Sequence, residues 1–201
     1  MIENYKKYLD IIQNKLDLFF EKQKEYIFCK EGCAKCCQNA QFPYSEIEYE
    51  YLLDGYKKLP KKIQEKIKEN AKLVLNKKKK FKENSEIFTY QCPFLINNLC
   101  ACYENRGIIC RTFGLLSSGA DDKNPQMPFC ILEGLNYSNV YDKETTRLSR
   151  EKFEHLNLKT PPTIFNIDYK TLINSDFEKC FNFKFGKVLA LVDHIERNPL
   201  P

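Results

Sequence analysis

The chain has 201 residues and a formal net charge of +5, from 32 Lys and Arg against 27 Asp and Glu. This length suits one domain with a sizeable core, and a small excess of dispersed lysines gives little reason to expect a nucleic-acid partner. No run approaches the roughly 18 apolar residues of a membrane span, and the charged N-terminus lacks the form of a signal peptide. We therefore expect a cytoplasmic protein with no membrane contact.

Apolar residues in the first segment recur at helical spacing, with Lys and Glu on the opposite face. They are Tyr5, Tyr8, Leu9, Ile12, Leu16, Phe19, Phe20 and Ile27. We predict a long amphipathic helix from Tyr5 to Ile27 that packs on the core and leads into the next segment.

Four cysteines fall within nine residues directly after this helix: Cys29, Cys33, Cys36 and Cys37. In a helix their sulfurs would share a face about 100° wide, and a knuckle-like loop around Gly32 would also bring them together. In a reducing compartment, the ten cysteines of the chain should be thiols or metal thiolates rather than disulfides. Simple burial explains the cluster less well, because charged residues stand between the cysteines. We interpret the cluster as a metal site.

Helix signals continue after the cluster. A capping box at Ser45–Glu48 predicts a helix through about Leu53, ended by Asp54-Gly55. Pro60 opens a further helix that runs into four consecutive lysines, Lys77–Lys80, which we interpret as a solvated helix end rather than a binding site.

The chain then returns toward the cysteines. Residues 82–86 are predicted to form a linker. The short apolar stretch Ile87–Tyr90 is expected to be either a strand or an extended wall of the site.

A second group of cysteines follows, in Cys92-Pro93-Phe94-Leu95, in Cys100-Ala101-Cys102-Tyr103-Glu104 with Arg106, and in Cys110-Arg111-Thr112-Phe113. A turn at Asn97-Asn98 would place Cys92 and Cys100 on either side of a hairpin-like knuckle. This group adds further soft ligands for a metal.

Together the two groups and a later cysteine resemble the YkgJ-like cysteine-cluster family, whose domain is associated with zinc or iron chelation. The resemblance covers about residues 29–130. It implies eight metal ligands: Cys29, Cys33, Cys36, Cys37, Cys92, Cys100, Cys110 and Cys130. Two positions depart from the family pattern. Gly107 stands where the family usually has proline and should loosen that turn, and Cys102, in place of an aliphatic residue, is either a ninth ligand or a bystander.

Two arginines flank the second cysteine group. Arg106 and Arg111 could donate hydrogen bonds to anionic sulfurs and offset their charge, which would make them cofactor-binding residues. A salt bridge to Glu104 is an equally good reading of the same residues.

The last third of the chain reads mainly as scaffold. Gly114–Gly134, with Asp121-Asp122, is predicted to be a loop that returns Cys130 to the other thiols. A helix from Asp142 to Leu156, a break at Thr160–Pro162 and a closing helix from Phe177 to Ile195 should follow.

Three further candidate ligands are expected to lie outside the site. We read Cys180 as a core or partly exposed residue, and His155 and His194 as ordinary surface or core residues.

These features predict a mainly α, single-domain fold over residues 1–201, with amphipathic helices around an irregular cysteine-rich metal-binding centre and little or no β structure. The centre lies in residues 29–130, and residues 1–28 and 140–197 form helical flanks. Eight thiolates exceed the four of one tetrahedral zinc site, so two sites or a multinuclear centre are expected.

The predicted function is metal binding, with an iron-sulfur cluster or iron expected ahead of zinc, and redox activity as a consequence of iron. Protein partners are unknown. The first rival rests on a similarity to the cysteine-rich part of flagellin lysine N-methylases, which implies a protein-modifying enzyme. No methyl-donor motif supports that rival. The second is a zinc-stabilised module that binds nucleic acid.

Overall fold

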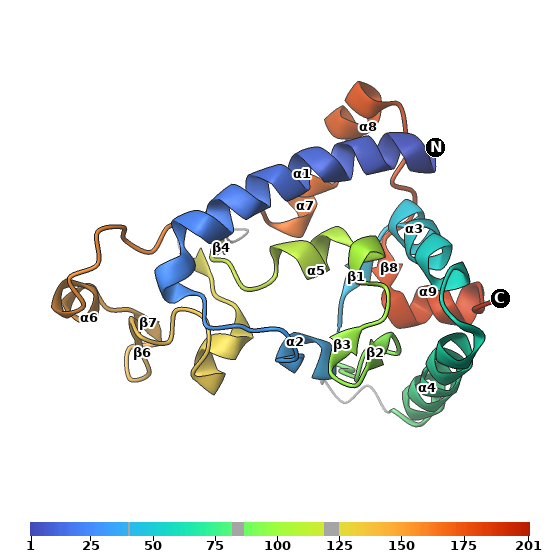
Figure 1. Cartoon of the computed structure of the whole chain (residues 1–201), viewed down its shortest axis with the longest axis horizontal. Helices are drawn as coiled ribbons and strands as arrows, with labels where there is room; N and C mark the ends of the chain where they lie inside the picture. The colour runs from blue at the N-terminus through green and yellow to red at the C-terminus, as the bar shows by residue number, and fades with distance from the viewer. Residues whose placement is uncertain (40, 82–86, 119–124) are drawn as a thin grey trace.

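Helices supply most of the regular structure, and the mainly α prediction is confirmed. The computed structural model describes residues 1–39, 41–81, 87–118 and 125–201 (Figure 1). The α-helices are α1 (Ile2–Lys22), α2 (Lys35–Gln38), α3 (Glu46–Lys57), α4 (Lys61–Lys80), α5 (Ile108–Thr112), α6 (Arg150–His155), α7 (Tyr169–Leu172), α8 (Ser175–Phe181) and α9 (Leu191–Arg197). Three 3₁₀ turns accompany them: η1 (Lys24–Tyr26), η2 (Tyr103–Asn105) and η3 (Phe129–Glu133).

The strands of the described segments form four antiparallel pairs of two residues each. Three are local hairpins: β2 (Leu95–Ile96) with β3 (Leu99–Cys100), β4 (Ser117–Ser118) with β5 (Pro125–Gln126), and β6 (Tyr141–Asp142) with β7 (Arg147–Leu148). The fourth joins β1 (Pro43–Tyr44) to β8 (Leu189–Ala190), so the chain segment before α3 is tied to the segment before α9.

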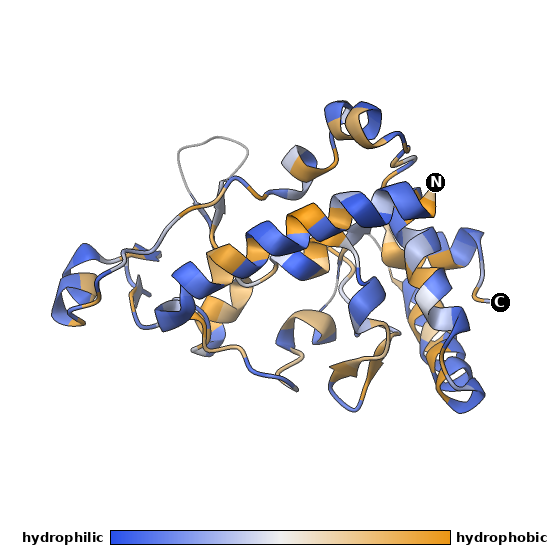
Figure 2. Cartoon of the chain, turned by 45° about the horizontal axis from the view of Figure 1, so that its top comes forward, coloured by the Kyte–Doolittle hydropathy of each residue, from blue (hydrophilic) through white to orange (hydrophobic). Residues whose placement is uncertain are grey.

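The long helix α1 runs along one side of the molecule, and α3, α4 and α9 gather at the end where the C-terminus lies (Figure 1). Hydrophobic and hydrophilic residues recur along α1 (Figure 2). Its buried side chains are Tyr5, Tyr8, Leu9, Ile12 and Leu16, as the spacing predicts. None of the helices within the described ranges is both long and apolar enough to cross a membrane.

The buried apolar residues form three clusters. The first joins α3, α4 and α9 to the second cysteine group. The second packs α1 against α3, α5 and the aromatic residues of 165–185. The third, around Tyr26, Ile131 and Tyr137, lies beside the end of α1. The cysteines lie on loops, short helices and a two-residue strand beside these clusters, and their exposure differs. Cys92, Cys102 and Cys130 are buried, Cys29 and Cys180 are exposed, and the other five are half-buried.

Local signals located several elements correctly. The capping box is present, with the Ser45 N–H donating to the Glu48 carboxylate at 2.8 Å, and α3 begins at Glu46. The helix after Pro60 is α4, and α1 matches its prediction up to Lys22. The prediction for Gln23–Ile27 was wrong, because the Gln23 side chain turns to Thr163 and the chain tightens into η1.

The α3 helix does not end at Asp54-Gly55 but continues to Lys57. Gly55 has a packing role instead: a Cβ there would lie 2.5–2.7 Å from side-chain atoms of Asn105. Asn105 donates to the Tyr51 carbonyl at 2.9 Å, which holds η2 against α3. The glycine marks a close approach of two elements rather than a helix end.

The predicted helix from Asp142 to Leu156 was also wrong over its first half, which forms the β6–β7 hairpin. The Asp142 carboxylate accepts from the N–H groups of Glu144 and Thr145 at 2.8 and 3.0 Å. Such local bonds compete with helix formation. Helix α6 starts only at Arg150, where the Ser149 hydroxyl accepts from the Lys152 N–H.

The closing helix predicted from Phe177 to Ile195 is in fact two helices, α8 and α9. Asn182 is left-handed, at φ 53°, and ends α8. Phe183 and Phe185 then lie in irregular chain and pack against Tyr5 and Tyr8. The apolar residues from Phe177 to Ile195 thus follow a helical spacing although they belong to two separate helices and the chain between them, which pack against different partners.

Two predictions concern residues outside the described ranges: the linker at 82–86 and the Asp121-Asp122 part of the Gly114–Gly134 loop. Ile87–Tyr90 belongs to no named β-strand, and the Tyr90 hydroxyl accepts from the Val192 N–H at 3.2 Å.

Replacing Gly55 by Ala tests the close approach of η2 to α3. An alanine in an open helix stabilises it by about 1 kcal/mol relative to glycine. Here we expect Gly55→Ala to lower the free energy of unfolding by about 1–3 kcal/mol in urea denaturation, because the new methyl group overlaps Asn105. In an Asn105→Gly background, which removes all the side-chain atoms that the new methyl group meets, the same change should become stabilising. A stabilising effect of Gly55→Ala alone would contradict the packing role.

Candidate metal centre

The first cysteine segment is a loop that ends in one turn of helix. The Cys33 N–H donates to the Lys30 carbonyl at 3.0 Å, and Gly32 has φ +81°. Ala34 is left-handed and precedes α2, which carries Cys36 and Cys37. Of the two alternatives, the knuckle-like loop is correct and the continuous helix is not, since two residues with positive φ interrupt it.

The second cysteine segment is built on the predicted turn. Asn97 and Asn98 have φ of 50° and 62° and join β2 to β3, the two-residue connection that fits the twist of a hairpin. The Cys92 N–H donates to the Cys37 carbonyl at 2.7 Å. This bond ties the second segment directly to the first.

The third segment, around Cys130, is held to the first by Asn136. The side-chain amide oxygen of Asn136 accepts from the N–H groups of Phe28 and Cys29, both at 2.9 Å. Its amide donates to the Gly114 carbonyl at 3.0 Å. Asn136 is almost fully buried, and nothing in the sequence pattern singled it out.

One set of thiols forms around Cys29. Cys29 is exposed at the surface, yet partial loss of water around its sulfur raises its pKa to about 12, and negative charge on Cys33, Cys36 or Cys130 adds to the rise. Burial likewise raises the pKa of Cys130 to about 11, with contributions from Cys36 and Cys33. We define these residues, Cys29, Cys33 and Cys130, as the first thiol group.

The other set forms around Cys92 and Cys110. Burial raises the pKa of Cys110 to about 12, against a hydrogen bond with Tyr44, and charge on Cys100 and Cys36 adds to it. Burial also raises the pKa of Cys92, with Cys110 and Cys100 as the nearest charges. The hydrogen bond with Cys36 and burial raise the pKa of Cys37, and negative charge on Cys92 and Cys110 adds to the rise. Cys37, Cys92, Cys100 and Cys110 are the second thiol group.

Cys36 lies between the two groups. It is an electrostatic neighbour of Cys29 and Cys130 in the first and of Cys100 and Cys110 in the second. Its sulfur is 3.9 Å from that of Cys37, and this hydrogen bond lowers the pKa of Cys36 to about 7. The eight predicted ligands are therefore linked, neighbour to neighbour, across three chain segments.

The remaining cysteines and the histidines differ in position. Cys102 is buried beside Tyr56 and Cys100 in the core. Cys180 is exposed. His194 is buried, stacks on Tyr49 and contacts the Tyr44 carbonyl at 2.8 Å, whereas His155 is exposed.

The two arginines act differently from each other. The buried Arg111 donates to the carbonyls of Arg106 and Glu104 and to the Gln13 side chain, at 3.0, 2.5 and 2.7 Å. All three nitrogens of the guanidinium group thus bond to oxygen, and the bond to Gln13 connects the second segment to α1. Arg106 lies over the Tyr103 ring. Burial raises the pKa of Cys100, and the charge of Arg106 opposes that rise.

Gly107 does not loosen its turn, contrary to expectation. A Cβ at Gly107 would lie 2.8 Å from the Tyr44 ring, so the turn is tightly packed. The Gly107 N–H donates to the Tyr44 hydroxyl at 3.1 Å. Proline has no N–H and could not make this bond.

The buried Glu48 holds the start of α5, the helix that carries Cys110. Its carboxylate accepts from the Ile108 N–H at 2.8 Å, from the Ser45 N–H and hydroxyl, and from the Tyr169 hydroxyl. Burial raises the pKa of Glu48, and the hydrogen bonds oppose that rise. The sequence indicated only the capping-box role of Glu48. Its bonds to Ile108 and Tyr169 could not be predicted, because both residues are distant in the chain.

The donor set fits a metal that prefers sulfur. Among the described residues no three His, Cys, Asp or Glu side chains are already arranged as a metal shell. A cysteine sulfur moves through one side-chain torsion, so neighbouring thiols can converge with little change of backbone. A cation among them would offset the burial and mutual repulsion that raise the pKa of most of these thiols.

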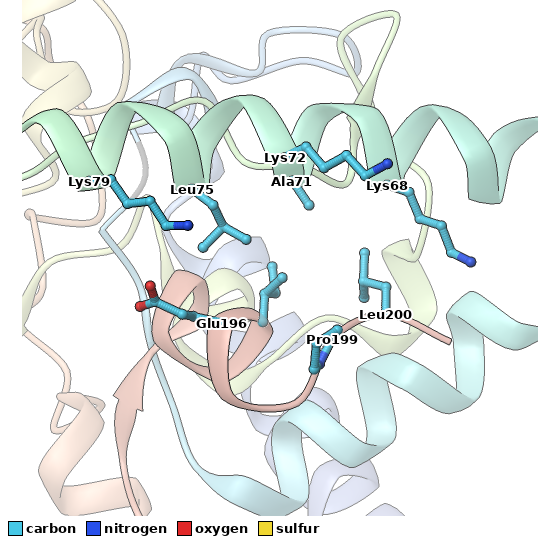
Figure 3. A pocket seen from close by; sticks show the side chains of 9 residues that line it. Lys68, Ala71, Lys72, Leu75, Lys79, Glu196, Pro199 and Leu200 are labelled. Carbon is cyan, nitrogen blue, oxygen red and sulfur yellow. The ribbon is translucent and has the colours of Figure 1, made fainter.

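A separate hollow of about 270 Å³ lies between α4 and the segment around α9 (Figure 3). Lys68, Lys72 and Lys79 border it, and Leu75 and Leu200 contribute apolar surface. It contains no cysteine, so it lies apart from the chemistry of the thiols.

A family model described as "CxxCxxCC: Putative zinc- or iron-chelating domain" matches residues 28–130 of the chain. The match covers about half of the chain and includes all eight predicted ligands and Cys102. No curated protein and no solved structure matches the chain.

The role of Asn136 can be tested by Asn136→Ala, which removes the acceptor of two N–H groups and the donor to a carbonyl. We expect a loss of about 2–3 kcal/mol in the free energy of unfolding and faster alkylation of Cys29, measured by peptide mass spectrometry. Asn139→Ala is the matched control, because the Asn139 side-chain oxygen has no partner within the described ranges. Equal effects of the two substitutions would show that Asn136 does not order this segment.

Proposed function

Because the chain belongs to the CxxCxxCC family of zinc- or iron-chelating domains, we propose that it binds more than one metal ion through cysteine thiolates. The ligands are Cys29, Cys33, Cys36, Cys37, Cys92, Cys100, Cys110 and Cys130. The observation that carries the proposal is that hydrogen bonds tie the three cysteine segments together: the Cys92 N–H donates to the Cys37 carbonyl, and the Cys29 N–H donates to the side chain of Asn136. Without a cation, thiols gathered in this way would gain little from apolar contact and would repel one another when ionised.

Cys36 is proposed to serve both thiol groups. The first group holds three other thiols, so Cys36 would complete the four donors that tetrahedral metals favour. The second group already holds four thiols, and Cys36 would join it as a fifth, shared sulfur. The support is its position, with neighbours in both groups. The centre would then be multinuclear.

Iron, as an iron-sulfur cluster or a multinuclear iron centre, is the proposed metal, with zinc as the alternative. Sulfur donors suit both. Bound iron would supply electron transfer, whereas zinc would supply a structural cross-link. The chain's own contribution is to fix the donor segments through Asn136 and the bond from the Cys92 N–H to the Cys37 carbonyl.

Arg106 is proposed to offset the negative charge of the second thiol group, because its charge favours the Cys100 thiolate. Arg111 has its nitrogens on oxygen acceptors, so its proposed part is to position the segment between Cys102 and Cys110.

The nucleic-acid alternative needs a free basic face, and the lysine run at the end of α4 supplies it only in part. Lys78 pairs with Asp193 and Glu196, both at 2.5 Å. Part of the lysine run is therefore engaged in holding α9 against α4 and is not free to bind nucleic acid, so the metal-binding function is favoured over this alternative.

Metal analysis of protein purified without oxygen tests the proposal. We expect more than one metal ion per chain, with visible absorption if the metal is iron. Cys36→Ser should remove the metal of the first group and also weaken metal retention by the second, because the shared sulfur is lost. Cys33→Ser should remove only the metal bound by the first group. Cys180→Ser is the control, since its exposed thiol lies in α8, outside both groups.

Two outcomes would overturn the proposal. A folded, metal-free wild-type protein would remove the function itself. Equal metal content in all three variants would show that the ligand set is wrong.

A further inference from the structure

The hydroxyl of Tyr44 contacts a proposed ligand directly. Its oxygen lies 3.3 Å from the Cys110 sulfur and accepts from the Gly107 N–H at 3.1 Å. A tyrosine hydroxyl has one hydrogen. Since the Gly107 N–H occupies an acceptor position of the oxygen, the hydroxyl hydrogen is free for the sulfur, its other partner within the described ranges.

The backbone of Tyr44 is held on two sides. It pairs with Leu189 across β1 and β8, and its carbonyl contacts the His194 ring nitrogen at 2.8 Å. The side chain is only 2% exposed. The ring therefore cannot swing away from the cysteine without disturbing the core.

The other partner, α5, is fixed from the same stretch of sequence. Glu48 accepts from the Ile108 N–H, and Tyr44 accepts from the Gly107 N–H, so both acceptors at the start of α5 come from residues 44–48. The absence of a side chain at Gly107 lets the Tyr44 ring approach. Sulfur and hydroxyl are thus placed relative to each other by two independent anchors.

We propose that Tyr44 is a positioning residue that donates a hydrogen bond to the Cys110 thiolate in the metal-loaded protein and so slows release of the metal. The inference rests on the proposed function. A hydrogen bond to a metal-bound sulfur draws charge from it and fixes its direction, and loss of such a partner typically costs tenfold or more in metal affinity.

Tyr44→Phe removes the hydroxyl and keeps the ring. With cobalt(II) as the probe metal, we expect the variant to transfer its metal to a chelator about tenfold faster than the wild type. The sulfur-to-cobalt absorption band should move to longer wavelength, because a sulfur without the hydrogen bond gives up charge more readily. Purely structural damage would not shift this band.

Tyr49→Phe is the matched control. Tyr49 is also 2% exposed and lies in the same core, but its hydroxyl donates to the Asn198 carbonyl at 2.6 Å. It should lose similar thermal stability while keeping the wild-type band and release rate. If Tyr44→Phe does not fold, Gly107→Ala replaces it, because the added methyl group displaces the Tyr44 ring.

The results separate the two proposals. A wild-type protein that binds no cobalt would overturn the proposed function and this inference with it. A cobalt-loaded Tyr44→Phe with the wild-type band and release rate would overturn only the role of Tyr44. Equal changes in Tyr44→Phe and Tyr49→Phe would do the same, since they would trace the effect to general loss of stability.

Discussion

The gathering of cysteine sulfurs from separate chain segments is the constraint on which the rest of this structure depends. Thiols are weak hydrogen-bonding groups, and thiolates repel one another when they lose water, as the raised pKa of Cys29, Cys110 and Cys130 indicates. Apolar contact alone gives little reason to gather eight of them from three distant segments. A cation removes both costs, so the unusual neighbourhood and the family membership lead to the same chemistry.

The scaffold supplies what the cysteine segments lack. These segments have short helices and two-residue strands, whereas α1, α3 and α4 bury continuous apolar faces. Polar anchors connect the two parts: Asn136 holds the segment of Cys29, and Glu48 holds the start of α5. Each anchor is buried and satisfies backbone N–H groups that no regular element could satisfy.

The sequence predicted features that depend on neighbours along the chain. The turn at Asn97-Asn98 and the helix after Pro60 follow from local backbone preferences. Features that depend on residues distant in the chain could not be predicted from the sequence. Gly55 has the sequence signal of a helix end but is required by the close approach of Asn105. The aromatic residues near Phe183 follow a helical period although they lie in irregular chain, because Tyr5 and Tyr8 bury them. Asn136 carried no signal, since a lone asparagine in a loop is ordinary.

The most direct test of the central claim, that metal binding organises the cysteine segments, is hydrogen exchange with and without a chelator. We expect protection to fall first and furthest at residues 28–39, 92–113 and 129–136 when the metal is removed, while α1 and α4 keep most of theirs because their packing is apolar. Unchanged protection of the cysteine segments in the metal-free protein would contradict the claim, because the fold would then hold them without the metal.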